Sequence, residues 1–411
     1  MSFDSWREIL DVLRRNKLRS ALTASSVAWG IFMLVLLLAA GNGLQHGVEY
    51  DFRDDATNSI WVRQGKTSLP FAGHAPGKPV NFDNADLTAL RHEVSGIEHM
   101  SGRFYIRGGM LVSRGDKSAS FDVRGCHPAH QYLEKTLLIS GRFINDLDEQ
   151  DRRKVAVIGP PVSSTLFGTA DPLGEMINIR GVNYQVIGVF EDQGGEGELR
   201  RIYIPLSTAQ LVYHGGDRVH QLMYTTGAAS LDESKAMAEH TRQLLSKRHH
   251  FDPNDRRAVQ VSNNLERFQK LMDIFGWIRS FVWIVGIGTL FAGIVGVSNI
   301  MIISVNERTL EIGVRKAIGA PPRSIIGMIL GEALLLTSFA GYVGLTAGVG
   351  VVELIRRHLP ENDYVRNPTV DVGVAVSATL LLIGAGALAG LLPALEAARV
   401  RPIVAMRQGT P

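Results

Sequence analysis

The chain has 411 residues, of which 45% are hydrophobic and 20% are charged, and its formal net charge is +3. A net charge this close to zero gives no reason to expect a nucleic acid or another polyanion as a partner. Cys126 is the sole cysteine of the sequence, which excludes an intramolecular disulfide.

Four segments are apolar and long enough to cross a bilayer as helices, since a hydrocarbon core of about 30 Å needs roughly 20 helical residues. They lie at 21–41, 276–305, 324–355 and 372–395. The first is too long for the apolar part of a cleaved signal peptide, which has roughly 7–15 residues, so we expect an uncleaved anchor. The sequence therefore predicts an α-helical membrane protein with four transmembrane helices and a large α/β domain inserted at 42–275.

Basic residues predict the orientation. They gather before the first span, between the second and third, and after the fourth, at Arg7, Arg14, Arg15, Lys17, Arg19, Arg308, Arg315, Lys316, Arg323, Arg399, Arg401 and Arg407. The positive-inside rule assigns these three regions to the cytoplasm. We therefore expect cytoplasmic termini, a cytoplasmic tail at 396–411, and an external side that holds both the large domain and the short loop 356–371.

The first 20 residues have the pattern of an amphipathic helix. Phe3, Trp6, Leu10 and Leu13 recur at spacings of three and four among charged residues. Such a helix lies in the headgroup region of a membrane or packs on a partner protein, and the adjacent span favours the membrane.

The large domain alternates between helical and strand-like segments. Helices are predicted at 44–56, 84–94, 231–248 and 265–277, and strands at 59–64, 104–112, 118–124, 154–158, 176–179, 183–190, 202–205 and 258–262. Helices and strands alternate at both ends of the domain, with a strand-rich stretch between them. This order predicts a first subdomain built from two separate pieces and a small β-rich insert at about 113–215.

Few residues indicate chemistry. Cys126, His127 and His130 are of metal-ligand types, but no second cluster stands at a ligand-like spacing, so we expect no metal. No nucleophile with a matching base stands out, so the sequence predicts neither catalytic nor cofactor-binding residues. Glu332, near the start of the third span, is expected to pack against the bundle rather than to transfer protons.

The loop between the second and third spans, 306–323, predicts a short cytoplasmic helix. Leu310, Val314, Ala317 and Ile318 share one face, and Glu311 precedes Arg315 by four residues, the favourable order for an ion pair. Gly319 is placed to end the helix, before Pro321 and Pro322. The residues alone favour equally a helix that docks in the groove of a cytoplasmic partner and one that lies on the membrane.

Several motifs resemble those of MacB/FtsX-type ABC transporter permeases. The segment 307–320 is similar to the family signature, the segment 390–407 to its C-terminal pattern, and the segment 16–23 to its entry into the first span. In the large domain, the similar stretches are 141–144, 155–159, 171–174 and 186–189. The resemblance covers nearly the whole chain, and its first two motifs are specific.

The resemblance implies that the loop is a coupling helix that contacts a nucleotide-binding subunit. The residues expected at this contact are Glu307, Arg308, Leu310, Glu311, Ile312, Gly313, Arg315, Lys316 and Gly319. No Walker A sequence is present, so ATP and Mg²⁺ are expected on a separate ABC ATPase and no cofactor on this chain. The resemblance also implies a location in the bacterial inner membrane and a porter-like part in the periplasmic domain. It further implies a dimer, which consists either of two copies of this chain or of this chain and a homologue.

The leading functional hypothesis is that the chain is the permease subunit of a MacB-like system, which uses ATP-driven motion for efflux. A periplasmic adaptor and an outer-membrane channel are candidate partners. Two family alternatives are a permease for lipoprotein release and an FtsX-like regulator of cell-wall hydrolases. FtsX-like members carry a smaller outer domain, which disfavours the regulator. A non-ABC sensor with an external ligand domain is a further alternative, which would not need the signature at 307–320.

Overall fold

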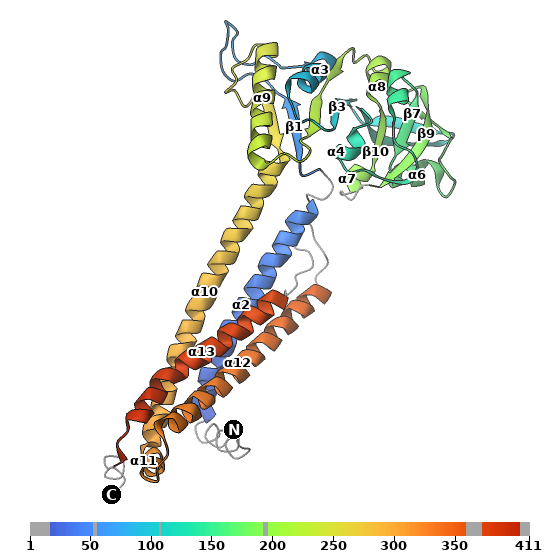
Figure 1. The fold of residues 1–411 in the computed structure, drawn as a ribbon. Helices are drawn as coiled ribbons and strands as arrows, with labels where there is room; N and C mark the ends of the chain where they lie inside the picture. Colours follow the sequence, from blue (N-terminus) through green and yellow to red (C-terminus); the bar gives the residue numbers. More distant parts are fainter. Residues whose placement is uncertain (1–16, 52–55, 107, 192–195, 359–371, 403–411) are drawn as a thin grey trace. The chain divides into compact units, whose positions relative to one another are not determined.

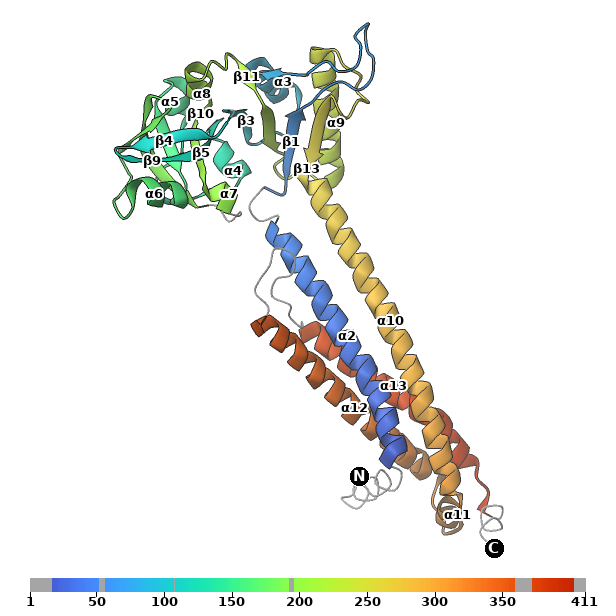
Figure 2. The ribbon, with the colours of Figure 1, turned by 180° about the vertical axis from the view of Figure 1, so that it is seen from behind.

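The computed structural model describes residues 17–51, 56–106, 108–191, 196–358 and 372–402 (Figures 1 and 2). Most of the amphipathic helix predicted at 1–20 and most of the loop predicted at 356–371 lie outside these residues. The chain divides into two compact units. We call Met1–Val48 with Asp273–Pro411 the helical unit and Glu49–Met272 the α/β unit, and describe each by itself.

Four long helices carry the predicted spans, namely α2 (Lys17–Asp51), α10 (Asn264–Glu307), α12 (Pro322–His358) and α13 (Val372–Arg399). Each contains an apolar stretch long enough to cross a membrane, which confirms the prediction of four spanning helices. The helix predicted at 265–277 runs into the second span, as expected, because both are part of α10. The described part of the helix predicted at 44–56 is the end of α2.

Glycines let the helices of the helical unit approach closely. A Cβ at Gly344 of α12 would lie 2.2 Å from the carbonyl oxygen of Ala28 in α2. A Cβ at Gly390 of α13 would lie 2.7 Å from the Cβ of Ala333 in α12. These are backbone approaches of the kind that small residues at a four-residue spacing permit. Gly327, in contrast, has nothing within 4 Å of its Cβ position and makes no such contact.

The α/β unit is built on one large sheet. Its strands are β1 (Ser59–Gln64), β3 (Met100–Tyr105), β4 (Met110–Arg114), β5 (Lys117–Cys126), β6 (Leu137–Gly141), β7 (Val155–Ile158), β8 (Met176–Ile179), β9 (Val182–Glu191), β10 (Arg201–Pro205), β12 (Gln221–Thr225) and β13 (Val259–Asn263). A separate small pair consists of β2 (Phe82–Asp83) and β11 (Arg218–Val219). The helices are α3 (Asn84–Glu93), α4 (His130–Leu133), α5 (Asp146–Gln150), α6 (Pro160–Phe167), α7 (Glu196–Leu199), α8 (Leu206–Val212) and α9 (Leu231–His249).

Part of this sheet closes on itself. Strand β10 pairs with β7 on one side and with β5 on the other, so that β10, β7, β9, β8, β4 and β5 form a ring. Strand β5 also pairs with β3, which continues into the open part of the sheet, in the order β3, β12, β1 and β13. Buried residues of the ring and of the open part, such as Val123 and Ile60, belong to one hydrophobic core.

Most strands agree with the sequence prediction, with two differences. The single strand predicted at 104–112 is wrong, because β3 ends at Tyr105 and β4 begins at Met110. Gly108 lies between them with φ +81°, a left-handed conformation that interrupts an extended strand. Strands β6 and β12 were not predicted, and neither were the two-residue strands β2 and β11.

Strand β13 passes into helix α10 without a connecting loop. Asn263 is the last residue of β13, and its side-chain oxygen accepts a hydrogen bond from the N–H of Glu266 at 3.2 Å. This is the bond of an N-cap residue. The Asn263 amide group donates to Ser234 at 2.8 Å, and the neighbouring Asn264 donates to Ser59 of β1 at 2.9 Å. The start of α10 is therefore fixed to the sheet of the α/β unit.

Candidate functional site

A short helix, as predicted for the loop 306–323, is present as α11 (Thr309–Ala317), which follows α10 after one residue. Arg308 separates the two helices with φ −106° and ψ 14°, and the Thr309 hydroxyl donates to the carbonyl oxygen of Asn306 at 2.9 Å. A threonine that binds the preceding turn in this way competes with the regular helical bonds and favours a break.

Helix α11 ends where the sequence predicts. Gly319 has φ +104°, a conformation that a glycine adopts without steric cost. Its N–H donates to the carbonyl of Lys316 at 3.1 Å, and the N–H of Ala320 donates to that of Arg315 at 3.0 Å. This pair of bonds defines a Schellman motif. Pro321 and Pro322 follow, and α12 begins at Pro322.

The two sides of α11 differ in burial. Ile312 is 2% exposed and joins the hydrophobic core of the helical unit with Ile325 and Ile329 of α12. Gly313 is buried as well. The predicted apolar face is exposed, and we call it the open face: it consists of Leu310, Val314, Ala317 and Ile318. Ile318 is 83% exposed, so a substantial apolar surface stands outside the core of the described chain.

The charged residues of this region make contacts within the chain. Glu311 and Arg315 form the predicted ion pair at 2.8 Å, and Arg315 also lies 3.0 Å from the sulfur of Met328. Lys316 Nζ donates to the carbonyl oxygens of Ala398, at 2.6 Å, and Val400, at 2.7 Å. These contacts hold α11 against α12 and the end of α13.

Arg308 connects the same region to the third span. Its guanidinium lies 3.5 Å from the carboxylate of Glu332, which is buried in α12. Glu332 is thus buried in the helical unit beside a cation, and its packing role stays a prediction. Glu307, the last residue of α10, is exposed. The structure thus brings the predicted site residues together around one short helix, with Ile312 and Gly313 on its inner side.

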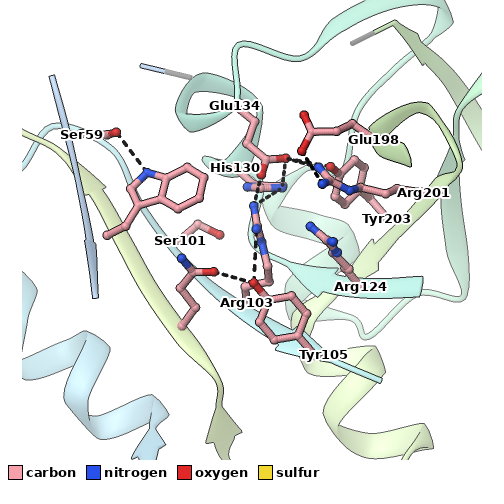
Figure 3. A network of polar contacts seen from close by, with 12 residues as sticks. Ser59, Ser101, Arg103, Tyr105, Arg124, His130, Glu134, Glu198, Arg201 and Tyr203 are labelled. Atoms are coloured by element: carbon pink, nitrogen blue, oxygen red, sulfur yellow. Dashed lines mark hydrogen bonds and ion pairs between the residues drawn. The ribbon is translucent and has the colours of Figure 1, made fainter. Parts of the chain in front are cut away.

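Sequence reasoning missed a buried polar network in the α/β unit (Figure 3). Arg103 of β3 forms an ion pair with Glu134, and both side chains are almost fully buried. Glu134 also lies 3.1 Å from His130 Nε2 and accepts a hydrogen bond from the Tyr203 hydroxyl at 2.7 Å. Burial alone would raise the pKa of Glu134, but the charges of Arg103 and His130 outweigh it and hold this pKa well below its ordinary value.

The network reaches the start of α10. The Arg103 guanidinium carbon lies 5.5 Å from the ring centroid of Trp61, within the range of a cation–π contact. The Trp61 N–H donates to the Ser59 hydroxyl at 3.0 Å, and this hydroxyl also accepts from Asn264. The participants come from β1, β3, α4, β10 and α10, so no local sequence pattern could have revealed them.

Two residues of the metal-ligand types have partners of their own. His127 Nδ1 accepts a hydrogen bond from the Gly102 N–H at 2.9 Å, and His130 is part of the buried network. Cys126 is buried, and burial raises the pKa of its thiol well above the ordinary value. Across the described ranges, no group of three or more His, Cys, Asp and Glu residues is arranged to hold a metal ion.

Comparison with known proteins finds two matching domain families along the chain. Residues 20–244 match the model of the MacB-like periplasmic core domain, and residues 283–402 match that of the FtsX-like permease C-terminal domain. The crystal structure of the periplasmic region of MacB from Actinobacillus actinomycetemcomitans covers 54% of this chain and 96% of its own, with 20% identity and a TM-score of 0.44.

Relatives match almost the whole chain. The macrolide export ATP-binding/permease protein MacB of Bdellovibrio bacteriovorus is 30% identical over 400 residues, which are 96% of this chain and 60% of that protein. The pyoverdine export ATP-binding/permease protein PvdT of Pseudomonas savastanoi is 29% identical over an alignment 417 residues long, which covers 98% of this chain and 60% of that protein. The chain thus spans about 60% of the length of these curated relatives. With a MacB-like periplasmic core domain joined to an FtsX-like permease domain, the chain belongs to the MacB-like family of ABC transporter permeases, membrane proteins with an external domain.

Proposed function

We propose that this chain is the permease subunit of a MacB-like ABC system, which transmits ATP-driven motion from a cytoplasmic ATPase to the external domain and thereby drives export. The single observation that carries the proposal is the open face of α11. Leu310, Val314 and Ile318 stand exposed on a short helix that directly follows a spanning helix. An apolar stripe at helical spacing is what a hydrophobic groove on a partner protein recognises.

The partner we propose is an ABC ATPase. The printed sequence contains no Walker A motif, so ATP and Mg²⁺ would bind to a nucleotide-binding unit that this sequence does not include. In this arrangement the chain itself carries out no chemistry. The contact residues would be Glu307, Leu310, Glu311, Val314 and Ile318, whereas Ile312 and Gly313 would support α11 from its buried side.

We propose α10 as the mechanical connection. It is one uninterrupted helix from Asn264, directly after β13, to Glu307, one residue before α11. A displacement of α11 by an ATPase would act on α12 and α13 through Arg308, Arg315 and Lys316. It would also act on the α/β unit through α10. Nucleotide binding can drive this movement only if it favours one conformation of the permease over another.

The proposed assembly contains two permease chains, either identical or homologous, in the bacterial inner membrane with cytoplasmic termini. The relatives are named for macrolide export and pyoverdine export, which supports export as the direction of transport. A periplasmic adaptor and an outer-membrane channel would complete the path to the outside. Release of lipoproteins and control of cell-wall hydrolases have no specific observation in their favour.

The test is photocrosslinking in native membranes from a cross-linkable amino acid at Val314, on the open face. We expect an ABC ATPase to be captured there, and not from the exposed position Leu354 in α12. Capture of lipid alone, or of proteins without a nucleotide-binding domain, would contradict the assignment.

A second experiment separates the two roles of the Glu311–Arg315 pair. Glu311→Arg and Arg315→Glu each break the ion pair, and the double variant restores it with reversed polarity. If the pair faces the ATPase, the double variant still fails to co-purify with the ATPase, because the charge pattern offered to the partner is reversed. Full recovery in the double variant would mean that the pair acts only within α11.

A further inference from the structure

The α/β unit has a cavity of about 500 Å³ that the proposed coupling mechanism does not use. Five elements surround it: the end of β3, the turn from β8 to β9, the end of α8, the following loop, and β11 with the residue after it. Its volume lies within the range of about 300–1,000 Å³ that is typical of small-molecule sites.

Aromatic side chains form part of its wall. Phe104 and Tyr105 contribute from the end of β3, and Tyr213 from the end of α8. The rings are held in place: the Tyr213 hydroxyl accepts from that of Tyr184 at 3.3 Å, and Phe104 packs against His220 with 4.8 Å between ring centroids. Such rings offer flat apolar surface to an aromatic or apolar ligand at a small cost in side-chain entropy.

The charged groups of the wall have one sign. Arg180 and Arg218 line the cavity together with His214 and His220, and among the described residues that line it there is no Asp or Glu. Arg218 is positioned by hydrogen bonds from its guanidinium to the carbonyl oxygens of Gly215, at 3.2 Å, and His214, at 3.4 Å. Neither arginine has a carboxylate partner within the part of the chain that the structure describes.

Arg180 is an unusual residue at its position in the turn between β8 and β9. With Gly181 it forms the two-residue connection between β8 and β9, and both have positive φ, 49° and 86°. Turns of this kind prefer Asn or Asp before the glycine. The arginine therefore contributes something other than turn propensity, and it is one of the residues that line the cavity.

We propose that this cavity binds a small organic anion that carries an aromatic or apolar ring, with a carboxylate between Arg180 and Arg218 and the ring against Phe104, Tyr105 and Tyr213. A planar guanidinium pairs with a carboxylate through two parallel N–H donors, which explains the use of arginines at this site. The inference does not rest on the function of α11, since binding is measured without an ATPase.

The experiment uses the full chain in nanodiscs of neutral lipid and isothermal titration calorimetry, with empty nanodiscs as the blank. The probes are benzoate, 2-naphthoate and indole-3-acetate, each beside its neutral amide. We expect saturable binding of at least one acid and at least tenfold weaker binding of its amide, because a hydrogen bond to a charged group contributes about 1.5–3 kcal/mol and about 1.4 kcal/mol is a factor of ten. Absence of saturable binding by all three acids, or equal binding of acid and amide, would overturn the proposal.

Variants locate the site. Arg180→Gln and Arg218→Gln should each weaken binding of the acid by about tenfold, and Tyr213→Ala should weaken acid and amide alike. Arg256→Gln removes an exposed arginine of the same unit that does not line the cavity, and it should leave binding unchanged. Circular dichroism checks that each variant is folded. Unchanged binding in the folded Arg180→Gln and Arg218→Gln variants, or equal loss in Arg256→Gln, would place the ligand elsewhere.

Discussion

The ammonium group of Lys316 lies 2.7 Å from the carbonyl oxygen of Val400, the residue that follows α13. The same group lies 2.6 Å from the carbonyl oxygen of Ala398, in the last turn of that helix. The last carbonyls of a helix lack intrahelical partners and carry a partial negative charge. Lys316 therefore caps the end of α13 from α11, and it joins two segments that are 82 residues apart in the sequence.

Lys316→Met should loosen α11 without changing its open face. A favourable charge at a helix end contributes about 0.3–1 kcal/mol, and up to about 2 kcal/mol when partly buried. The measurement is the maleimide labelling rate of an Ile312→Cys reporter, at a position that is 2% exposed on the inner side of α11, in inverted membrane vesicles after Cys126→Ser has removed the native thiol. We expect a rate increase of a few-fold. Arg323→Met, which removes an exposed cation in the first turn of α12, serves as the control, and equal labelling in all three backgrounds would contradict the capping role.

Glu134→Gln should strongly destabilise the α/β unit. The change leaves Arg103 buried without its counter-charge, and breaking a buried ion pair from one side costs about 3–5 kcal/mol. Thermal unfolding of the full chain in detergent, followed by intrinsic fluorescence, measures the effect. Arg103→Met combined with Glu134→Gln should recover part of the loss, because no unpaired charge then remains. A double variant less stable than Glu134→Gln would argue against charge burial as the cause.

His127 should make the stability of the α/β unit sensitive to mild acid. Burial and the positive charge of Arg91 lower the pKa of His127 from 6.5 to about 4, and its Nδ1 accepts from the Gly102 N–H only when unprotonated. Between these two values the unfolded chain binds more protons than the folded one. The stabilisation is therefore complete above pH 6.5 and falls as the pH drops towards 4, by at most about 1.4 kcal/mol per pH unit.

The measurement is the unfolding temperature of the full chain across that window. His127→Gln should flatten the dependence, although not abolish it, because burial also lowers the pKa of His130. The carboxyl groups with lowered pKa, such as Asp86, lose their contributions at a lower pH. His240→Gln, at an exposed histidine, should behave like the unchanged chain. A pH profile that is the same with and without His127 would refute the assignment.

Gly344→Ala should force α2 and α12 apart. The added Cβ would lie 2.2 Å from the backbone oxygen of Ala28, and a backbone atom cannot rotate away. Overpacking of this kind costs about 1–3 kcal/mol. Gly350→Ala, in the same helix, meets nothing within 4 Å and is the matched control. Thermal stability in detergent, read by size-exclusion chromatography, should fall for the first variant only.

The sequence predicted features that depend on local patterns. Four apolar stretches indicated the spans, and the period of Leu310, Val314 and Ile318 indicated the face of α11 that the structure leaves exposed. Gly319 and the two prolines indicated the end of that helix correctly, because backbone conformation there depends on the residues themselves. For the same reason the strands with clear borders, such as β1 and β8, were found at their observed bounds.

Features that depend on pairing between distant segments were not predicted. The parallel pairing of β10 with β5 closes the ring of strands, yet neither strand carries a local sign of its neighbour. The ion pair of Arg103 with Glu134 joins β3 to the residue after α4, and in the sequence each looks like an ordinary surface charge. Charges are seldom buried without a partner, but the sequence does not say which partner is near.

The shared residue at the junction of β13 and α10 has a consequence for the length of the chain. Because Asn263 ends the strand and also caps the helix, there is no loop between them that could accommodate an inserted residue. An α-helix turns by about 100° per residue, so one residue added or deleted after Asn263 would rotate the side chains that follow it by about 100° about the helix axis. The direction in which each side chain of α10 points about the helix axis is therefore set by the number of residues that separate it from Asn263.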